Sequence, residues 1–145
     1  KNPNVGMYSP IGGKLEVQDG EGPHDCAIRE IFEESGLQLE SEQVRMLGIV
    51  SETAYEHSTH WLIFLFEVTR PVMHEEIPLM EFDEGELEWI KPEDIDALEF
   101  PQTDREVMWP LVRSHRSGFF VVHIDCTTDP MTWVVHESVK GAHHV

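Results

Sequence analysis

The sequence predicts an α/β fold in a single domain of 145 residues. One segment, Pro23–Ser35, has the pattern of an amphipathic helix, and two later segments, 44–51 and 60–68, have the composition of strands. Two apolar segments near the C-terminus, 119–126 and 131–137, flank a Thr-Thr-Asp-Pro turn and predict a β-hairpin. A chain of this length can bury a substantial core.

The strongly negative net charge of the chain argues against some kinds of binding partner. The chain has 28 acidic against 10 basic residues, a formal net charge of −18. This argues against a groove for nucleic acid and against binding to an anionic membrane surface. An anionic small molecule remains compatible with the composition, because bound cations can reverse the local field.

The cysteines and the apolar segments predict an intracellular protein. Cys26 and Cys126 stand alone, so we expect two reduced thiols rather than a disulfide, and no Cys/His cluster suggests zinc. The longest apolar segments, such as 61–66, are too short to cross a bilayer, and no secretory signal is visible. We therefore expect a cytoplasmic location.

The predicted helix begins and ends with residues suited to those positions. Pro23 fits a first turn, Asp25 favours the positive N-terminal end, and Gly36 follows as a stop. Its apolar residues lie on one side and predict a face against the core: Ala27, Ile28, Ile31 and Phe32.

Three glutamates, Glu30, Glu33 and Glu34, lie together on the adjoining face of this helix. Like charges at such spacings repel one another, and Arg29 alone cannot neutralise them together with Glu21 just upstream. A divalent cation could, and ligands that are all oxygen favour Mg²⁺ or Mn²⁺ over Zn²⁺. For an isolated motif of this kind, a solvated helix face is the commoner explanation.

The neighbouring residues resemble the box of the Nudix hydrolase family. The second half of that pattern matches residues 29–37 at every specified position, as Arg-Glu-Ile-Phe-Glu-Glu-Ser-Gly-Leu, with Glu21 seven residues upstream. The first half differs, because seven residues rather than five separate Gly13 from Glu21, which gives the loop 16–20 two extra residues. A loop insertion of this size costs little free energy.

The resemblance implies a fold, namely an α/β/α sandwich with a mixed sheet, formed by one Nudix domain over residues 1–145. The hairpin within 119–137 would extend the usual core, and 138–145 would form a tail. A strand normally precedes the turn at 4–10 in this family. Since the sequence starts at Lys1, we expect that strand to be absent here and residues to be missing upstream.

The resemblance also implies roles for the box residues. The implied metal ligands are the Gly12 carbonyl, Glu21, Glu30, Glu33 and Glu34. Water would attack a phosphorus atom of a nucleoside diphosphate linked to another group, with Mg²⁺, or alternatively Mn²⁺, as cofactor. The implied catalytic residues are Arg29, which would orient a glutamate, together with Glu33, Glu34 and Glu81.

The segment before the box is expected to contact the substrate. Residues 7–11 predict a short strand, and Gly12 and Gly13 permit close approach of the backbone to a phosphate or metal. Lys14 follows, either as a phosphate ligand or as an exposed loop residue. Between the strands at 44–51 and 60–68, His57 and His60 could touch a ligand, although isolated histidines are more often surface groups.

The sequence after the first two strands predicts several short elements. The segment 60–68 is almost continuously apolar and predicts a strand buried on both faces. A long loop over 70–83 is followed by a strand at 85–90 and a short helix at 91–95. A turn at 100–104 then precedes a helix that runs to about His115.

Part of this region is similar to MutT-type members of the family, which hydrolyse oxidised purine nucleoside triphosphates. The similarity implies Glu81 as a distal acid, Phe100 as a stacking platform, and Thr103 or Asp104 as a hydrogen-bonding group for the base. The alternatives are a core position for Phe100 and an N-cap for Asp104.

The C-terminal hairpin has apolar residues that could cover the sheet or form a dimer contact: Phe120, Val122, Trp133 and Val135. A homodimer is expected from the habit of the family. The first substrate predicted is a nucleoside triphosphate, such as oxidised dGTP, giving monophosphate and pyrophosphate. ADP-ribose or a nucleotide sugar is the alternative among enzymes. A non-catalytic nucleotide sensor is the alternative of another class, disfavoured because the box retains all four glutamates and Arg29.

Overall fold

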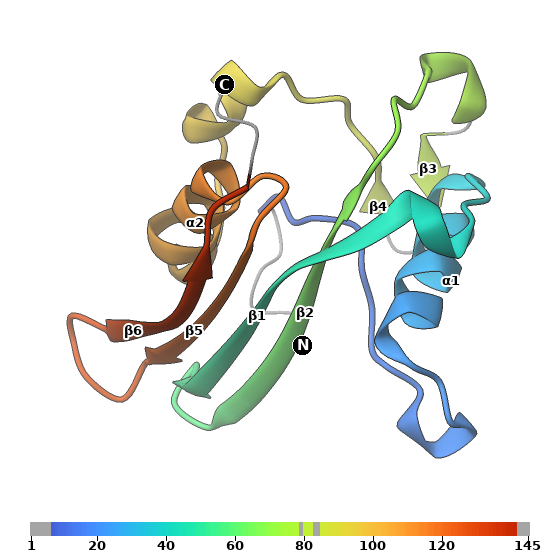
Figure 1. Ribbon diagram of the computed structural model, residues 1–145. Helices are drawn as coiled ribbons and strands as arrows, with labels where there is room; N and C mark the ends of the chain where they lie inside the picture. Colours follow the sequence, from blue (N-terminus) through green and yellow to red (C-terminus); the bar gives the residue numbers. More distant parts are fainter. Residues whose placement is uncertain (1–6, 79, 83–84, 142–145) are drawn as a thin grey trace. The chain divides into compact units, whose positions relative to one another are not determined.

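The computed structural model describes residues 7–78, 80–82 and 85–141 (Figure 1). The strands are β1 (Val44–Tyr55), β2 (Thr59–Val68), β3 (Glu81–Phe82), β4 (Gly85–Glu86), β5 (Phe119–Asp125) and β6 (Thr132–Val139). The α-helices are α1 (Pro23–Ser35) and α2 (Trp109–Ser114). Short 3-10 helices are η1 (Val17–Asp19), η2 (Ser41–Gln43), η3 (His74–Glu76) and η4 (Pro92–Ala97), and η5 (Asp104–Met108) is π-helical.

The chain divides into two compact units. The first comprises Lys1–Arg45 and Glu67–Glu99, and the second comprises Met46–Phe66 and Phe100–Val145. The first unit holds α1 and the small β3–β4 sheet, and the second holds most of the large sheet together with η5 and α2. Part of the predicted turn at 4–10, the end of the predicted tail at 142–145 and the loop positions 83–84 lie outside the described residues.

The large sheet has four strands in the order β2-β1-β5-β6. β1 and β5 run parallel, with Gly48 opposite Phe120 and Glu52 opposite Ile124. β5 and β6 are antiparallel, so the predicted hairpin forms. The predicted α/β class with a mixed sheet is confirmed.

The core of the second unit lies against β1 and β5. Alternate residues of β5 point inward, and Phe120, Val122 and Ile124 are fully buried there. They form one cluster with Leu47, Val50, Val107 and Met131. On β6, Trp133 and Val135 are about two-fifths exposed, at 43% and 39%. The two strands of the hairpin thus differ, since β5 supplies core residues and β6 leaves its large apolar side chains accessible.

The helix α1 begins and ends where the sequence predicts. Pro23 occupies its first turn, and Gly36 ends it with a positive φ of 77° while its N–H donates to the Phe32 carbonyl. The predicted apolar face is only partly covered, because Phe32 is 50% exposed. The most buried positions of the helix are Cys26 and Ser35, and both cysteines are free thiols, as predicted.

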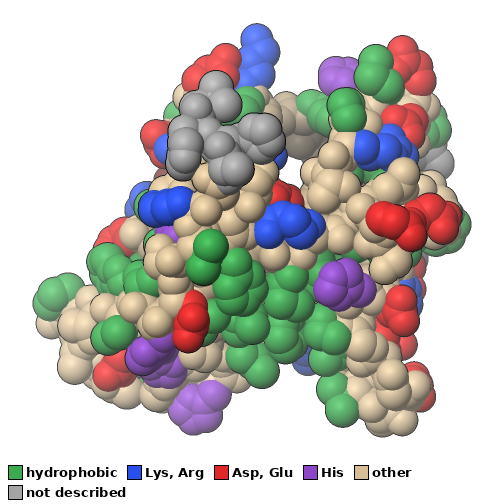
Figure 2. Space-filling model, viewed as in Figure 1, with side chains coloured by type: hydrophobic (Ala, Val, Ile, Leu, Met, Phe, Trp, Pro, Cys, Tyr) green, Lys and Arg blue, Asp and Glu red, His purple; other side chains and the backbone are tan. Residues whose placement is uncertain are grey.

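Several predicted elements differ from the structure. The prediction that the strand at 60–68 is buried on both faces is wrong. β2 is an edge strand, and its side chains Trp61 and Leu62 are exposed. Figure 2 shows exposed hydrophobic side chains on this face of the sheet. An apolar run alone does not reveal whether a partner covers it. Residues 7–11 form no strand, and the predicted strand at 85–90 is only β4. β6 continues through Val139, two residues into the predicted tail.

The segment after Thr103 is helical over the predicted range but is wound in two ways. It starts as the π-helical turn η5 and continues as α2. Asp104 lies inside this turn and is buried, so it is not the N-cap that the sequence allowed. None of the described helices is both long and apolar enough to cross a bilayer.

Candidate active site

The loop before α1 accommodates its two extra residues as the turn η1. This turn ends at Gly20, which adopts a left-handed φ of 77°, and the chain then returns so that Glu21 accepts a hydrogen bond from the Glu16 N–H (3.0 Å). With the insertion present, Glu21 lies beside α1, where it accepts two hydrogen bonds from Arg29.

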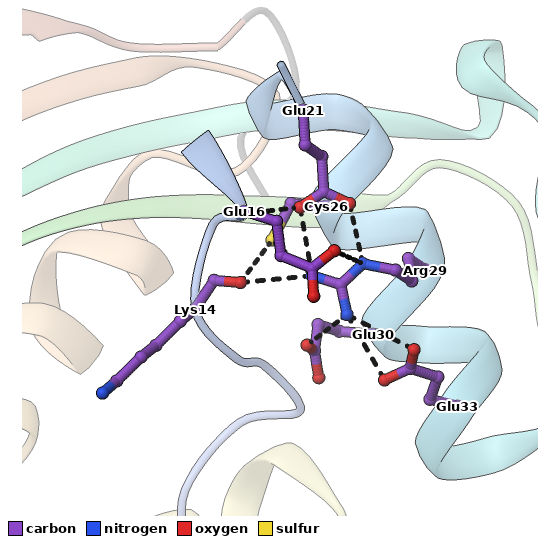
Figure 3. Close-up of polar contacts among 7 residues, drawn as sticks. All are labelled: Lys14, Glu16, Glu21, Cys26, Arg29, Glu30 and Glu33. Carbon is purple, nitrogen blue, oxygen red and sulfur yellow. Dashed lines mark hydrogen bonds and ion pairs between the residues drawn. The ribbon is translucent and has the colours of Figure 1, made fainter. Parts of the chain in front are cut away.

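Arg29 organises the acidic side chains of the first unit (Figure 3). Its Nε and Nη2 donate to the two carboxylate oxygens of Glu21, at 2.7 and 3.0 Å. Its Nη1 donates to Glu30 (2.8 Å) and, more weakly, to both oxygens of Glu33 (3.3 Å). Nη2 also donates to the Lys14 carbonyl (3.1 Å). One guanidinium thus gathers three of the four box glutamates, and its fork geometry fixes their directions.

These contacts shift the protonation of the cluster. The hydrogen bonds from Arg29, helped by the Glu16 N–H, lower the pKa of Glu21 to about 2. The pKa of Arg29 is raised, first by its hydrogen bond to Glu21. Glu21 therefore stays ionised at any pH near neutrality, and the cluster keeps excess negative charge.

The glycine turn brings backbone against one of these carboxylates. A Cβ atom at Gly13 would lie 2.3 Å from the carboxylate of Glu30, well inside van der Waals contact. Only glycine leaves room for Glu30 in its present position. The double glycine of the sequence therefore has a steric role at its second residue.

The donor set fits a hard cation. Glu30 and Glu33 converge on a single point, the Nη1 of Arg29, and both offer only oxygen. Within the described residues, no three Asp, Glu, His or Cys side chains have the arrangement of a metal centre.

The remaining predicted residues of the first unit lie around this cluster. Gly12 and Lys14 are exposed, and the Lys14 side chain points away from Arg29 (Figure 3). Glu34 is half-buried on α1. Glu81 is exposed on β3, which packs against α1 within the same unit. The structure thus brings together Glu21, Arg29, Glu30 and Glu33, with Glu81 on an adjacent element.

The predicted base-binding residues lie in the second unit. Phe100 is 5% exposed and packs at a tilt against Trp109, with ring centroids 5.9 Å apart. Thr103 and Asp104 are also buried. Burial raises the pKa of Asp104 to about 6, although the Thr103 hydroxyl opposes the shift. The burial of Phe100 agrees with the alternative prediction that this residue belongs to the core.

One acidic residue of the second unit escaped the sequence analysis. Glu52 lies on β1 and is only 4% exposed. Burial, with the negative charge of Asp104 as the second cause, raises its pKa to about 7. The signal was present in the sequence, since Glu52 falls between the apolar residues Val50 and Ala54 on the inward side of an alternating strand.

Two comparisons relate the chain to known proteins. A family model for the NUDIX domain matches residues 1–111, which include the Arg29 cluster and stop before the C-terminal hairpin. Among solved structures, the chain is similar to the crystal structure of a mutator MutT protein from Bacillus halodurans. The TM-score is 0.69 at 23% identity, over 92% of this chain and 85% of the other. This likeness establishes the fold.

Proposed function

Because the chain belongs to the Nudix family of hydrolases, we propose that it is a Mg²⁺-dependent pyrophosphohydrolase whose substrate is a nucleoside triphosphate. The products would be a nucleoside monophosphate and pyrophosphate. The observation that supports this most directly is the hydrogen-bonded cluster of Arg29 with Glu21, Glu30 and Glu33. A catalytically silent relative would have no need to keep these carboxylates oriented.

The positioning work falls to Arg29. Two of its N–H groups hold both carboxylate oxygens of Glu21, while the single Nη1 is divided between Glu30 at 2.8 Å and Glu33 at 3.3 Å. Glu30 and Glu33 can therefore turn to a cation while Arg29 remains anchored on Glu21. Glu34 and the Gly12 carbonyl are the further ligands that we assign.

The bound cations would supply charge neutralisation for the phosphates and a more acidic water. The residues of the chain would do the rest. Glu33 or Glu34 would accept the proton of the attacking water, with Glu81 as the alternative base. Lys14, exposed beside the glycine turn, would bind a phosphate oxygen.

The residues that we assign to the base are Thr103 and Asp104, with Phe100 as the aromatic residue of the same segment. The hydroxyl of Thr103 and the carboxyl of Asp104 would provide hydrogen-bonding groups, whereas stacking on Phe100 would require its ring, which packs on Trp109, to become accessible. Oxidised dGTP is the first substrate to test, in view of the MutT protein that shares the fold.

A panel of substrates tests the reaction class. Purified protein with Mg²⁺ is supplied with the common and oxidised nucleoside triphosphates, ADP-ribose and a nucleotide sugar, and the products are identified. We expect pyrophosphate from a triphosphate. Release of AMP from ADP-ribose, with no triphosphate consumed, would overturn the substrate class.

A variant tests the assignment of the box. Glu34→Gln should lower turnover by about 10²- to 10⁴-fold, because it removes a ligand or the general base. Glu42→Gln, an exposed glutamate in the same unit, is the matched control and should keep full activity. An unchanged rate in Glu34→Gln, with the fold intact by circular dichroism, would refute the metal assignment.

A further inference from the structure

Glu52 is a buried acid without a counter-charge. Its Oε2 atom is buried and accepts no hydrogen bond from the described residues. None of the ion pairs found among those residues includes Glu52 or Asp104. Burial of a polar oxygen in this state costs free energy, so a protein has little reason to keep it unless a ligand uses it.

The neighbours that act on the carboxyl of Glu52 among the described residues are an acid and a hydroxyl. Thr103 donates a hydrogen bond to its carboxyl, and Asp104 is close enough to act on it by charge. Cys126, just after β5, is the other titratable neighbour, and its pKa is raised by burial and then by Glu52. His123 bonds Ser51 and Thr53, which flank Glu52 and point to the opposite face of the strand.

This environment favours a single shared proton. Burial and the charge of Asp104 raise the pKa of Glu52 to about 7, and burial raises that of Asp104 to about 6. Near neutral pH, one carboxyl of the pair is protonated while the other is ionised. The pair then offers an O–H donor beside a carboxylate acceptor, a combination that two ionised acids lack.

The element that carries Asp104 strengthens the case for a ligand. Asp104 is the first residue of the π-helical turn η5, and such turns are frequent at functional sites. Thr103 and Asp104 are also the residues to which the proposed function assigns the base. A nucleobase edge has a donor next to an acceptor and so complements the pair.

We propose that Glu52 is a specificity-determining residue which, together with Asp104, binds the donor–acceptor edge of a nucleobase through one shared proton. The proposal rests on the proposed function for the identity of the ligand. It adds that binding of the base consumes a proton at alkaline pH, because the fully ionised pair has no donor. Affinity should therefore fall as the pH rises above neutrality.

Binding of nucleosides tests this without metal or phosphate. Nucleosides with each of the common bases and with oxidised guanine are titrated into the full chain and followed by NMR at about pH 6 and about pH 8. We expect at least one base to bind, with affinity about tenfold weaker at the higher pH. Glu52→Gln has a permanent N–H donor and should bind equally at both values.

The controls separate this role from a structural one. Glu106→Gln makes the same chemical change at an exposed residue two positions after Asp104 and should keep the pH dependence of the wild type. Asp104→Asn is the second test variant, and it should also abolish the pH dependence of nucleoside binding. Binding of no nucleoside by the wild type, or an unchanged pH dependence in Glu52→Gln, would overturn the proposal. A chain that binds nucleosides in this way but releases no pyrophosphate with Mg²⁺ would refute only the proposed function.

Discussion

The two units of the molecule hold acidic side chains in opposite environments. In the first unit, Arg29 donates to Glu21, Glu30 and Glu33, and the pKa of Glu21 is lowered. In the second unit, Glu52 and Asp104 are buried and take part in none of the ion pairs found among the described residues, and the pKa of each is raised. A carboxyl group of the first unit is thus ionised at neutral pH, whereas the two carboxyl groups of the second unit have pKa values of about 6 and about 7.

The difference shows that the number of acids says little about their chemistry. Hydrogen bonds from a cation stabilise the ionised form, and burial beside another acid stabilises the protonated form. The first group is suited to cations and the second to a neutral hydrogen-bonding partner. Substitutions that exchange these environments test the comparison.

The largest effect is expected from Arg29→Gln, which removes the shared donor from the first group. Glu21, Glu30 and Glu33 then lose their orientation, and kcat/KM should fall by about 10- to 100-fold. Steady-state kinetics over a range of Mg²⁺ concentrations measures this. Arg29→Lys keeps the charge without the fork and should recover only part of the activity. Full activity in Arg29→Gln would show that the cluster has no positioning role.

The pH dependence of stability probes the second group. The pKa of Glu52 is raised from 4.5 to about 7 on folding, so the folded chain binds more protons between these values, and stability falls as the pH rises through that window. Glu52→Gln removes this slope. Relative to the wild type, the variant should gain on the order of 2 kcal/mol in free energy of unfolding between about pH 4 and about pH 8. Urea unfolding at a series of pH values measures the gain, and parallel curves for the two proteins would contradict it.

A smaller effect on activity is expected from a change at Gly13, whose backbone lies against the carboxylate of Glu30. Gly13→Ala places a methyl group at the position of the Glu30 carboxylate, 2.3 Å away, and must displace it. We expect kcat/KM to fall about tenfold while the melting temperature changes little. Gly22→Ala is the matched control, because nothing lies within 4 Å of the added atom. Equal activity in the two variants would mean that Glu30 can move freely.

The smallest effect should come from an ordinary pair outside both groups. Arg45 donates to Glu67 (2.6 Å) within the first unit, with the Arg45 side chain 34% exposed. Arg45→Gln should lower the free energy of unfolding by less than about 1 kcal/mol, and added salt should reduce the difference further. Thermal unfolding at low and high salt checks this. A loss of about 2 kcal/mol or more would remove the distinction between an acid that is paired with a cation and the acids Glu52 and Asp104.

Residues close in sequence explain what could be predicted. The helix α1 and the shared face of Glu30 and Glu33 follow from helical spacing, and Arg29 reaches Glu33 one turn later. The hairpin followed from two apolar segments and a turn, whereas the mixed sheet was implied by the resemblance to the Nudix family. These features depend on neighbouring residues, so a single sequence contains them.

Features that depend on distant residues were missed. The proximity of Glu52 to Asp104 joins β1 to η5 across more than fifty positions, and no local pattern encodes it. The exposure of β2 depends on the sheet order, which places β2 at an edge. The π-helical geometry of η5 likewise has no characteristic residue pattern from which it could be predicted.

The turn η1 takes up the two extra residues of the loop before α1, and Glu21, which follows it, still contacts Arg29. Gly20 reverses the backbone, and the contacts of Glu21 with Glu16 and Arg29 close the loop at its base. The turn behaves as a spacer whose tip, Val17–Asp19, has no buried residue. A short epitope or a fluorescent reporter could accordingly be attached at this tip while the Glu21 carboxylate keeps its contacts, which would label the protein beside the Arg29 cluster.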